Sequence, residues 1–271
     1  MPSFSLTKTY LDCQTDNGTT IVCYASVLSL GHLKFRHASW LELLPDGTSK
    51  RRQTFIRGAM PENTEQGNIL WQCRSLHAAG TWRPEHPSLP LQHLHTERGL
   101  TTDWHCLQPR SRVSLRLENR HYEGIGYAER LHMTLPPWKL PIDTLHWGRF
   151  LGDKGSTIIW IVWEGPSPVT LLWDTQWRHH PAGLHASADG SSLRTDTLRL
   201  DFDRRHILRE GAIGSTVLRT FPALAKKLLP PSILHLHECK WAGRATLTTS
   251  SGTEPGLSIH EIVRFSPPSA S

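Results

Sequence analysis

The sequence predicts an all-β protein made of two halves, on the basis of three observations. Short segments in which apolar and polar residues alternate recur along the 271-residue chain, and turn residues separate them. This is the pattern of antiparallel strands. Only one short segment carries helix signals, and the strand pattern begins afresh after residue 150. We therefore expect two antiparallel β-barrel or sandwich halves packed together, covering residues 1–136 and 137–271.

The strands expected in the first half are joined by turns. They cover residues 21–25, 33–43, 53–56, 69–73, 112–118 and 127–135. Pro45-Asp46-Gly47 is a typical turn after the second strand. Between residues 58 and 110 the sequence is rich in Pro, His and polar residues, so we expect long loops there apart from 69–73.

The second half has a similar plan with one helix. Its expected strands cover residues 158–163, 169–173, 197–202, 233–245 and 257–265. A short helix is predicted at 220–229, because Thr220 is a good cap, Pro222 suits a first turn and Pro230-Pro231 ends a helix. Residues 136–147, which begin with Pro-Pro-Trp, would connect the halves, since residues before proline favour extended backbone.

Composition excludes several classes of protein. The net charge of +6 is scattered, with one short run at Lys50-Arg51-Arg52 that we interpret as solvated surface, so no nucleic-acid partner is expected. Five widely spaced cysteines without a C-x-x-C motif favour a reducing compartment. With no signal peptide and no apolar run long enough to span a bilayer, we expect a cytoplasmic protein without a membrane span. The sequence does not indicate an oligomeric state.

Glu129 is the most unusual residue in a predicted strand. Side chains alternate across a strand, so Glu129 shares a face with Tyr127 and Leu131. A carboxyl among apolar residues is costly to bury unless it is paired, neutral or functional. Glu129 is therefore a candidate general acid.

Glu238 and Glu261 repeat this pattern in the closing strands. If the three carboxyls converge, desolvation and repulsion would raise at least one pKa and leave a proton donor near neutral pH. The alternative is that each carboxylate forms a structural ion pair with a buried arginine. The arginines considered for that role are Arg130, Arg149, Arg244 and Arg264.

Histidine pairs suggest a rival chemistry. His93 with His95, and His235 with His237, would each share a strand face, a spacing used in zinc and iron sites. Glu97 or Glu238 would complete such a site. With seventeen histidines in the chain, H-x-H pairs arise without purpose, so we predict no metal and no other cofactor. Motifs for nucleophilic catalysis and for nucleotide binding are also missing.

Three segments in the centre of the chain resemble a known superfamily. They are Gly124-x-Gly126-Tyr127-x-Glu129, Pro137-Trp138-x-Leu140-Pro141 and Leu145-x-Trp147-Gly148-Arg149-Phe150, supported by similar closing strands at 238–245 and 260–263. The superfamily contains carotenoid 1,2-hydratases, AttH-like lipocalin-like proteins and tocopherol-cyclase-like proteins. The sequence departs from the hydratases after the Gly-Tyr pair, where Ala128-Glu129-Arg130 replaces an Asp-His-Asn type of run.

The resemblance implies two lipocalin-like halves around an apolar pocket, and cofactor-independent acid chemistry on an isoprenoid or polyketide-like substrate. We expect a hydratase, cyclase or isomerase with Glu129 as acid and Glu238 or Glu261 as a second acid or cation stabiliser. The residues expected to shape the substrate pocket are Tyr127, Trp138, Trp147, Arg149 and Trp241. The alternatives are a non-catalytic carrier of an apolar ligand and, less favoured, a His-ligated metal enzyme.

Overall fold

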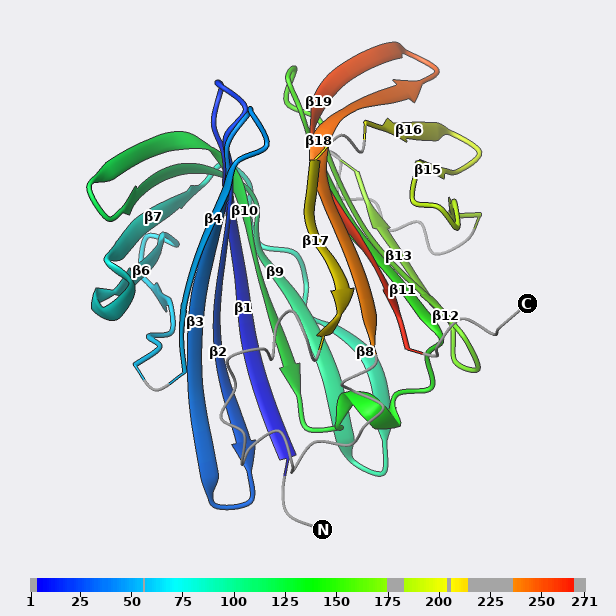
Figure 1. Cartoon of the computed structure of the whole chain (residues 1–271). Helices are drawn as coiled ribbons and strands as arrows, with labels where there is room; N and C mark the ends of the chain where they lie inside the picture. The colour runs from blue at the N-terminus through cyan, green and yellow to red at the C-terminus, as the bar shows by residue number, and fades with distance from the viewer. Residues whose placement is uncertain (1–3, 56, 175–182, 204–205, 214–235, 266–271) are drawn as a thin grey trace. The chain divides into compact units, whose positions relative to one another are not determined.

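The computed structural model describes residues 4–55, 57–174, 183–203, 206–213 and 236–265. The described chain is built almost entirely from strands, arranged in two antiparallel sheets (Figure 1). Each sheet belongs to one of two compact units, Met1–Lys139 and Leu140–Ser271. The all-β fold with two lipocalin-like halves is confirmed. The predicted helix at 220–229 lies outside the described residues.

Unit 1 contains a ten-stranded sheet in the order β4-β3-β2-β1-β10-β9-β7-β6-β5, with β8 also pairing with β9. Its elements are β1 Phe4–Gln14, β2 Thr20–Leu30, β3 Leu33–Leu43, β4 Ser49–Thr54, β5 Glu62–Asn63, β6 Ile69–Cys73, the 3-10 turn η1 Arg74–Leu76, β7 Ala78–Pro84, β8 Gln92–Glu97, β9 Leu100–Leu117, β10 Arg120–Met133 and the 3-10 turn η2 Pro137–Lys139. The first and tenth strands lie side by side, with Tyr10 opposite Glu129.

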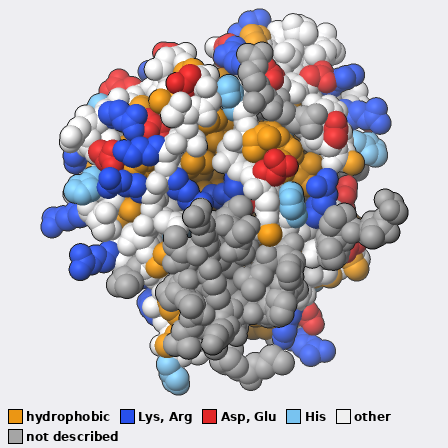
Figure 2. All heavy atoms as spheres, viewed as in Figure 1, with side chains coloured by type: hydrophobic (Ala, Val, Ile, Leu, Met, Phe, Trp, Pro, Cys, Tyr) orange, Lys and Arg blue, Asp and Glu red, His pale blue; other side chains and the backbone are white. Residues whose placement is uncertain are grey.

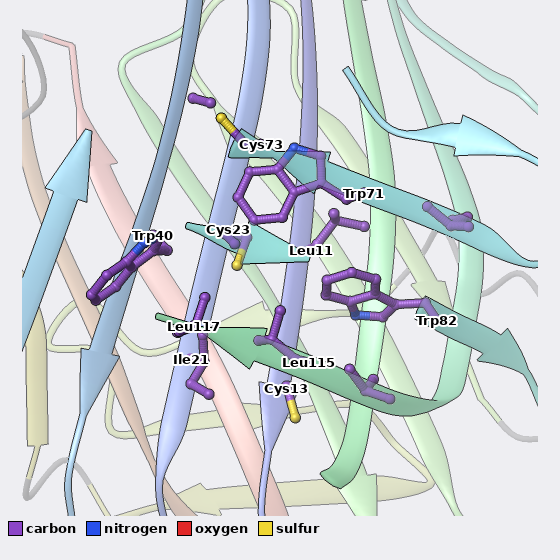
Figure 3. Packing of buried hydrophobic residues seen from close by; sticks show 14 of the residues in the cluster. Leu11, Cys13, Ile21, Cys23, Trp40, Trp71, Cys73, Trp82, Leu115 and Leu117 are labelled. Atoms are coloured by element: carbon purple, nitrogen blue, oxygen red, sulfur yellow. The ribbon is translucent and has the colours of Figure 1, made fainter. Parts of the chain in front are cut away.

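The sheet of unit 1 curls so that β6 and β7 cover one face of β1 and β2. Figure 3 shows Trp71 and Trp82 lying across from Leu11 and Ile21 in this core. Trp40, Trp71 and Trp82 are at most 1% exposed. Each indole N–H donates to a main-chain carbonyl, of Leu76, Ala59 and Asp12 respectively. Tryptophan can therefore fill this apolar interior without an unsatisfied donor.

Unit 2 contains a nine-stranded sheet in the order β13-β12-β11-β19-β18-β16-β15-β14, with β17 also pairing with β18. Its strands are β11 Thr144–Gly152, β12 Thr157–Glu164, β13 Val169–Trp173, β14 His185–Ala186, β15 Ser192–Arg194, β16 Leu198–Phe202, β17 His206–Ala212, β18 His237–Thr249 and β19 Gly252–Arg264. Phe150, Trp160 and Leu200 belong to its main core. Among the described residues, no helix is long and apolar enough to cross a membrane.

The prediction of long loops between residues 58 and 110 is largely wrong. β7 and β8 lie there, and β9 begins at Leu100 and runs for 18 residues. The long β9 offers main-chain partners to both β7 and β8. Main-chain pairing of this kind does not require apolar side chains, so polar composition concealed these strands.

Candidate active site

Glu129 is buried on β10 and held by two donors. Its side chain is only 8% exposed. Trp104 on β9 donates its indole N–H to Oε2 at 2.5 Å, and the Tyr127 hydroxyl donates to the same oxygen at 2.8 Å. The carboxyl therefore has a fixed orientation within unit 1. The structure brings together the predicted residues Glu129 and Tyr127 and adds Trp104.

The backbone around Glu129 is irregular in a way that sets this orientation. The β9–β10 register shifts between Gly126 and Ala128, and again between Ala128 and Glu129. Such bulges turn side chains toward new directions and are frequent beside functional sites. Buried Gln108 holds the irregular part of β9, donating to the carbonyls of Gly67 and Trp82.

The groups beside Glu129 remain neutral donors. Cys106 lies opposite Glu129 in the β9–β10 register, and burial raises the pKa of its thiol, with the nearby Glu129 adding to the effect. Burial also raises the pKa of Tyr127, reinforced by Cys106 and Glu129. At neutral pH both groups therefore keep their protons.

A second buried carboxyl, Asp12, was not predicted. Asp12 is fully buried on β1 and accepts a hydrogen bond from the Tyr10 hydroxyl at 3.0 Å. The Tyr10 ring lies 6.1 Å from that of Tyr127. Alternation along β1 could have predicted where Asp12 lies. Tyr10 and Asp12 lie on one face of the strand, and the core residues Leu11 and Cys13 lie on the other.

In unit 2, Glu261 forms an ion pair with a buried lysine. Lys240 is 3% exposed, and its Nζ lies 2.5 Å from Oε2 of Glu261. The same ammonium group lies 5.0 Å from the centre of the Trp147 ring. Lys240 faces Glu261 across β18 and β19, and Trp147 faces Glu261 across β11 and β19.

Glu238 lies two residues before Lys240 on the same face of β18. Both carboxylate oxygens are within 3.1 Å of Nη1 of Arg209, which comes from β17. Glu238 and Glu261 thus have ion-pair partners, as the structural alternative expected. The partners are Arg209 and Lys240, however, whereas Arg244 pairs with Asp153.

The other predicted pocket residues are dispersed. Arg149 is fully buried on β11, two residues after Trp147, and donates to the carbonyl of Leu257. Trp241 lies on the opposite face of β18 from Glu238 and Lys240. Its ring stacks on that of His260, with ring centres 5.1 Å apart. Trp138 lies in η2 of unit 1, edge-on to Phe4. The structure therefore does not place Trp138 or Trp241 beside a predicted acid.

Of the two predicted histidine pairs, only His93 and His95 lie wholly in the described part of the chain. The β8–β9 register shifts between His93 and His95. His93 contacts Asp103 at 2.7 Å. No group of three or more His, Cys, Asp or Glu in the described part of the chain could hold a metal ion. His235 lies outside that part.

The two antiparallel sheets define a lipocalin-like β protein of two halves. No protein-family model matches the sequence, and no functionally curated protein matches it.

Solved structures share the fold over nearly the whole chain. An AttH-like protein from Nitrosomonas europaea is 12% identical with a TM-score of 0.57, covering 98% of this chain and 93% of its own. Kievitone hydratase from Nectria haematococca is 10% identical with a TM-score of 0.57, covering 97% and 89%. CghA, also solved with Sch210972, is 10% identical with a TM-score of 0.60, covering 96% and 88%. The resemblance inferred from the central segments is thereby confirmed at the level of the fold, which is one that a hydratase uses.

Proposed function

We propose that this protein is a cofactor-independent hydratase, cyclase or isomerase that acts on a hydrophobic isoprenoid or polyketide-like small molecule. Glu129 is the general acid in this proposal. The observation that carries it is the burial of Glu129 together with the two hydrogen bonds that fix Oε2. A carboxyl oriented in an apolar setting can donate a proton to a substrate that offers no strong base.

The arrangement around Oε2 specifies how the acid would work. Trp104 and Tyr127 both donate to Oε2, so in this proposal Oε1 carries the proton that is transferred. In a hydration, that proton adds to an alkene carbon, water attacks the resulting cation, and the proton lost by this water returns to Glu129. In a cyclisation, an internal nucleophile replaces water. In both reactions all atoms and protons are accounted for without a cofactor.

The predicted carboxyls of unit 2 are not proton donors in this proposal. Glu261 and Glu238 are already paired with Lys240 and Arg209. The Lys240 ammonium also lies over the Trp147 ring, 5.0 Å from its centre, so no residue of unit 2 takes part in the acid step.

The test measures conversion of a defined probe. Purified protein is incubated with kievitone in H₂¹⁸O, and products are followed by mass spectrometry. A hydratase adds one labelled water, whereas a cyclase or isomerase gives a product of unchanged mass and altered retention. Lipophilic extracts of the producing cells serve as a second substrate source.

The decisive variant is Glu129→Gln, with Glu123→Gln as the matched control on an exposed position of β10. Glu129→Gln should lose general acid catalysis and slow the reaction by about 10²–10⁴-fold. The Glu123→Gln control should keep the wild-type rate. Turnover that survives Glu129→Gln unchanged would exclude Glu129 as the acid. Stoichiometric lipophilic material that co-purifies and is never converted would favour a carrier.

A further inference from the structure

A pocket on unit 1 lies apart from the residues discussed so far. It has a volume of about 470 Å³ and is lined by Arg57, Ala59, Gln72, Arg74 and Ser75. Pockets for small ligands span roughly 300–1,000 Å³. Gln72 alternates with buried Trp71 and Cys73 along β6, so the pocket opens on the outer face of this strand, away from the tryptophan core.

One wall of the pocket, Arg57–Ala59, is fixed on two sides. The Arg57 carbonyl accepts the Ser75 hydroxyl, and the Ala59 carbonyl accepts the Trp71 indole N–H at 2.9 Å. Gly58 lies so close to β3 that a Cβ would stand 2.6 Å from the carbonyl carbon of His37. The wall is therefore held in place before any ligand binds.

Both arginines are exposed and lack an acidic partner. Every Asp and Glu of the chain lies in the described part, and no ion pair joins any of them to Arg57 or Arg74 there. By contrast, Lys50 and Arg52 on β4 do have an acidic partner, because both form ion pairs with Glu118. Figure 2 shows Lys and Arg side chains on the visible surface of unit 1, with Asp and Glu side chains among them.

We propose that this pocket binds the phosphate group of a small organic phosphate. Two guanidinium groups supply forked donors that match phosphate oxygens, and the exposed Gln72 amide supplies a further donor. The remaining volume accommodates the organic part. The site is independent of Glu129, so either proposal can fail without the other.

The test is calorimetric titration of the full chain with phenyl phosphate and inorganic phosphate at constant ionic strength. Saturable binding is expected, tighter for phenyl phosphate because the pocket has room for its ring. Arg57→Gln and Arg74→Gln should each weaken binding by roughly tenfold or more, the loss expected for a charge-assisted hydrogen bond. The control Arg98→Gln removes an arginine that is 90% exposed in a turn, and it should bind as the wild type does.

A second variant protects the test against a folding defect. Arg74→Lys keeps the charge and loses the forked geometry, so its affinity should lie between those of the wild type and Arg74→Gln. Benzoate serves as the carboxylate probe of the same size. Tighter binding of benzoate, no saturable binding of either phosphate, or equal loss in Arg98→Gln would each overturn the proposal.

Discussion

The Glu129–Tyr127 hydrogen bond gives a prediction at the scale of single residues. Tyr127→Phe and Glu129→Leu should each destabilise unit 1, and the double variant should lose less than the sum. The coupling free energy is expected to be about 1–3 kcal/mol, because each single change deprives the remaining buried polar group of one hydrogen bond. Urea unfolding of the four proteins measures it. Additivity within about 0.5 kcal/mol would show that the bond contributes no coupling.

Alternation along a strand accounts for most of what the sequence could predict about the site. It placed Tyr127 and Glu129 on one face, as the structure has them. It also placed Trp241 opposite to Glu238, a consequence that the pocket prediction overlooked. Arg209 and Lys240 could not be identified as ion-pair partners, because the pairing depends on how β17, β18 and β19 align, which local sequence does not specify.

At the scale of elements, the glycines of β10 allow this strand to lie against β1. A Cβ at Gly126 would stand 2.1 Å from the carbonyl oxygen of Asp12, and one at Gly124 would stand 2.2 Å from that of Gln14. Neither glycine has a positive φ. The close approach of the β1 backbone is therefore the reason that a side chain does not fit at these positions. This explains in physical terms why the Gly-x-Gly-Tyr segment precedes Glu129.

Gly126→Ala should therefore lower the free energy of unfolding by about 1–3 kcal/mol, the usual cost of overpacking, and displace Tyr127 and Glu129. Gly47→Ala is the control for backbone strain, since Gly47 has φ +87° with nothing within 4 Å of its Cβ position. Denaturant midpoints compare the two. A loss at Gly126 no larger than that at Gly47 would contradict the contact argument.

Strand boundaries were predictable where the apolar pattern was local. The predicted strands 33–43, 69–73 and 169–173 coincide with β3, β6 and β13. β8 escaped prediction because His93 and His95 flank a register shift in a polar segment. β8 pairs with the start of β9, which follows it directly in the chain, so the missing signal was apolar alternation and not a distant partner.

For the whole molecule, the half-buried His105 and the buried His146 predict weaker stability in mild acid. Burial lowers the pKa of His105, with Arg130 adding to the effect and a hydrogen bond to the Leu89 backbone opposing it. Burial also lowers the pKa of His146, opposed by Glu164 and reinforced by Arg264. Both histidines therefore bind protons more weakly in the folded state than in the unfolded state.

The stabilising effect of keeping them neutral is complete above the ordinary pKa of 6.5. It is lost as the pH falls below that value, because the unfolded state then binds more protons. The free energy of unfolding should decrease between pH 7.5 and 5.5, and His105→Gln should reduce the slope. Calorimetric unfolding across this range checks the sign, and stability that rises on acidification would contradict it.

The pairing of β1 with β10 also bears on the order of events during synthesis. The strands β1 to β4 follow one another and can pair as they emerge, yet the free edge of β1 waits until residues 120–133 have been made. Unit 2 repeats this arrangement, because β11 pairs with β19 at residues 252–264. Each nascent half thus exposes an open strand edge for most of its translation, a period when unpaired edges invite misassembly and holding chaperones bind.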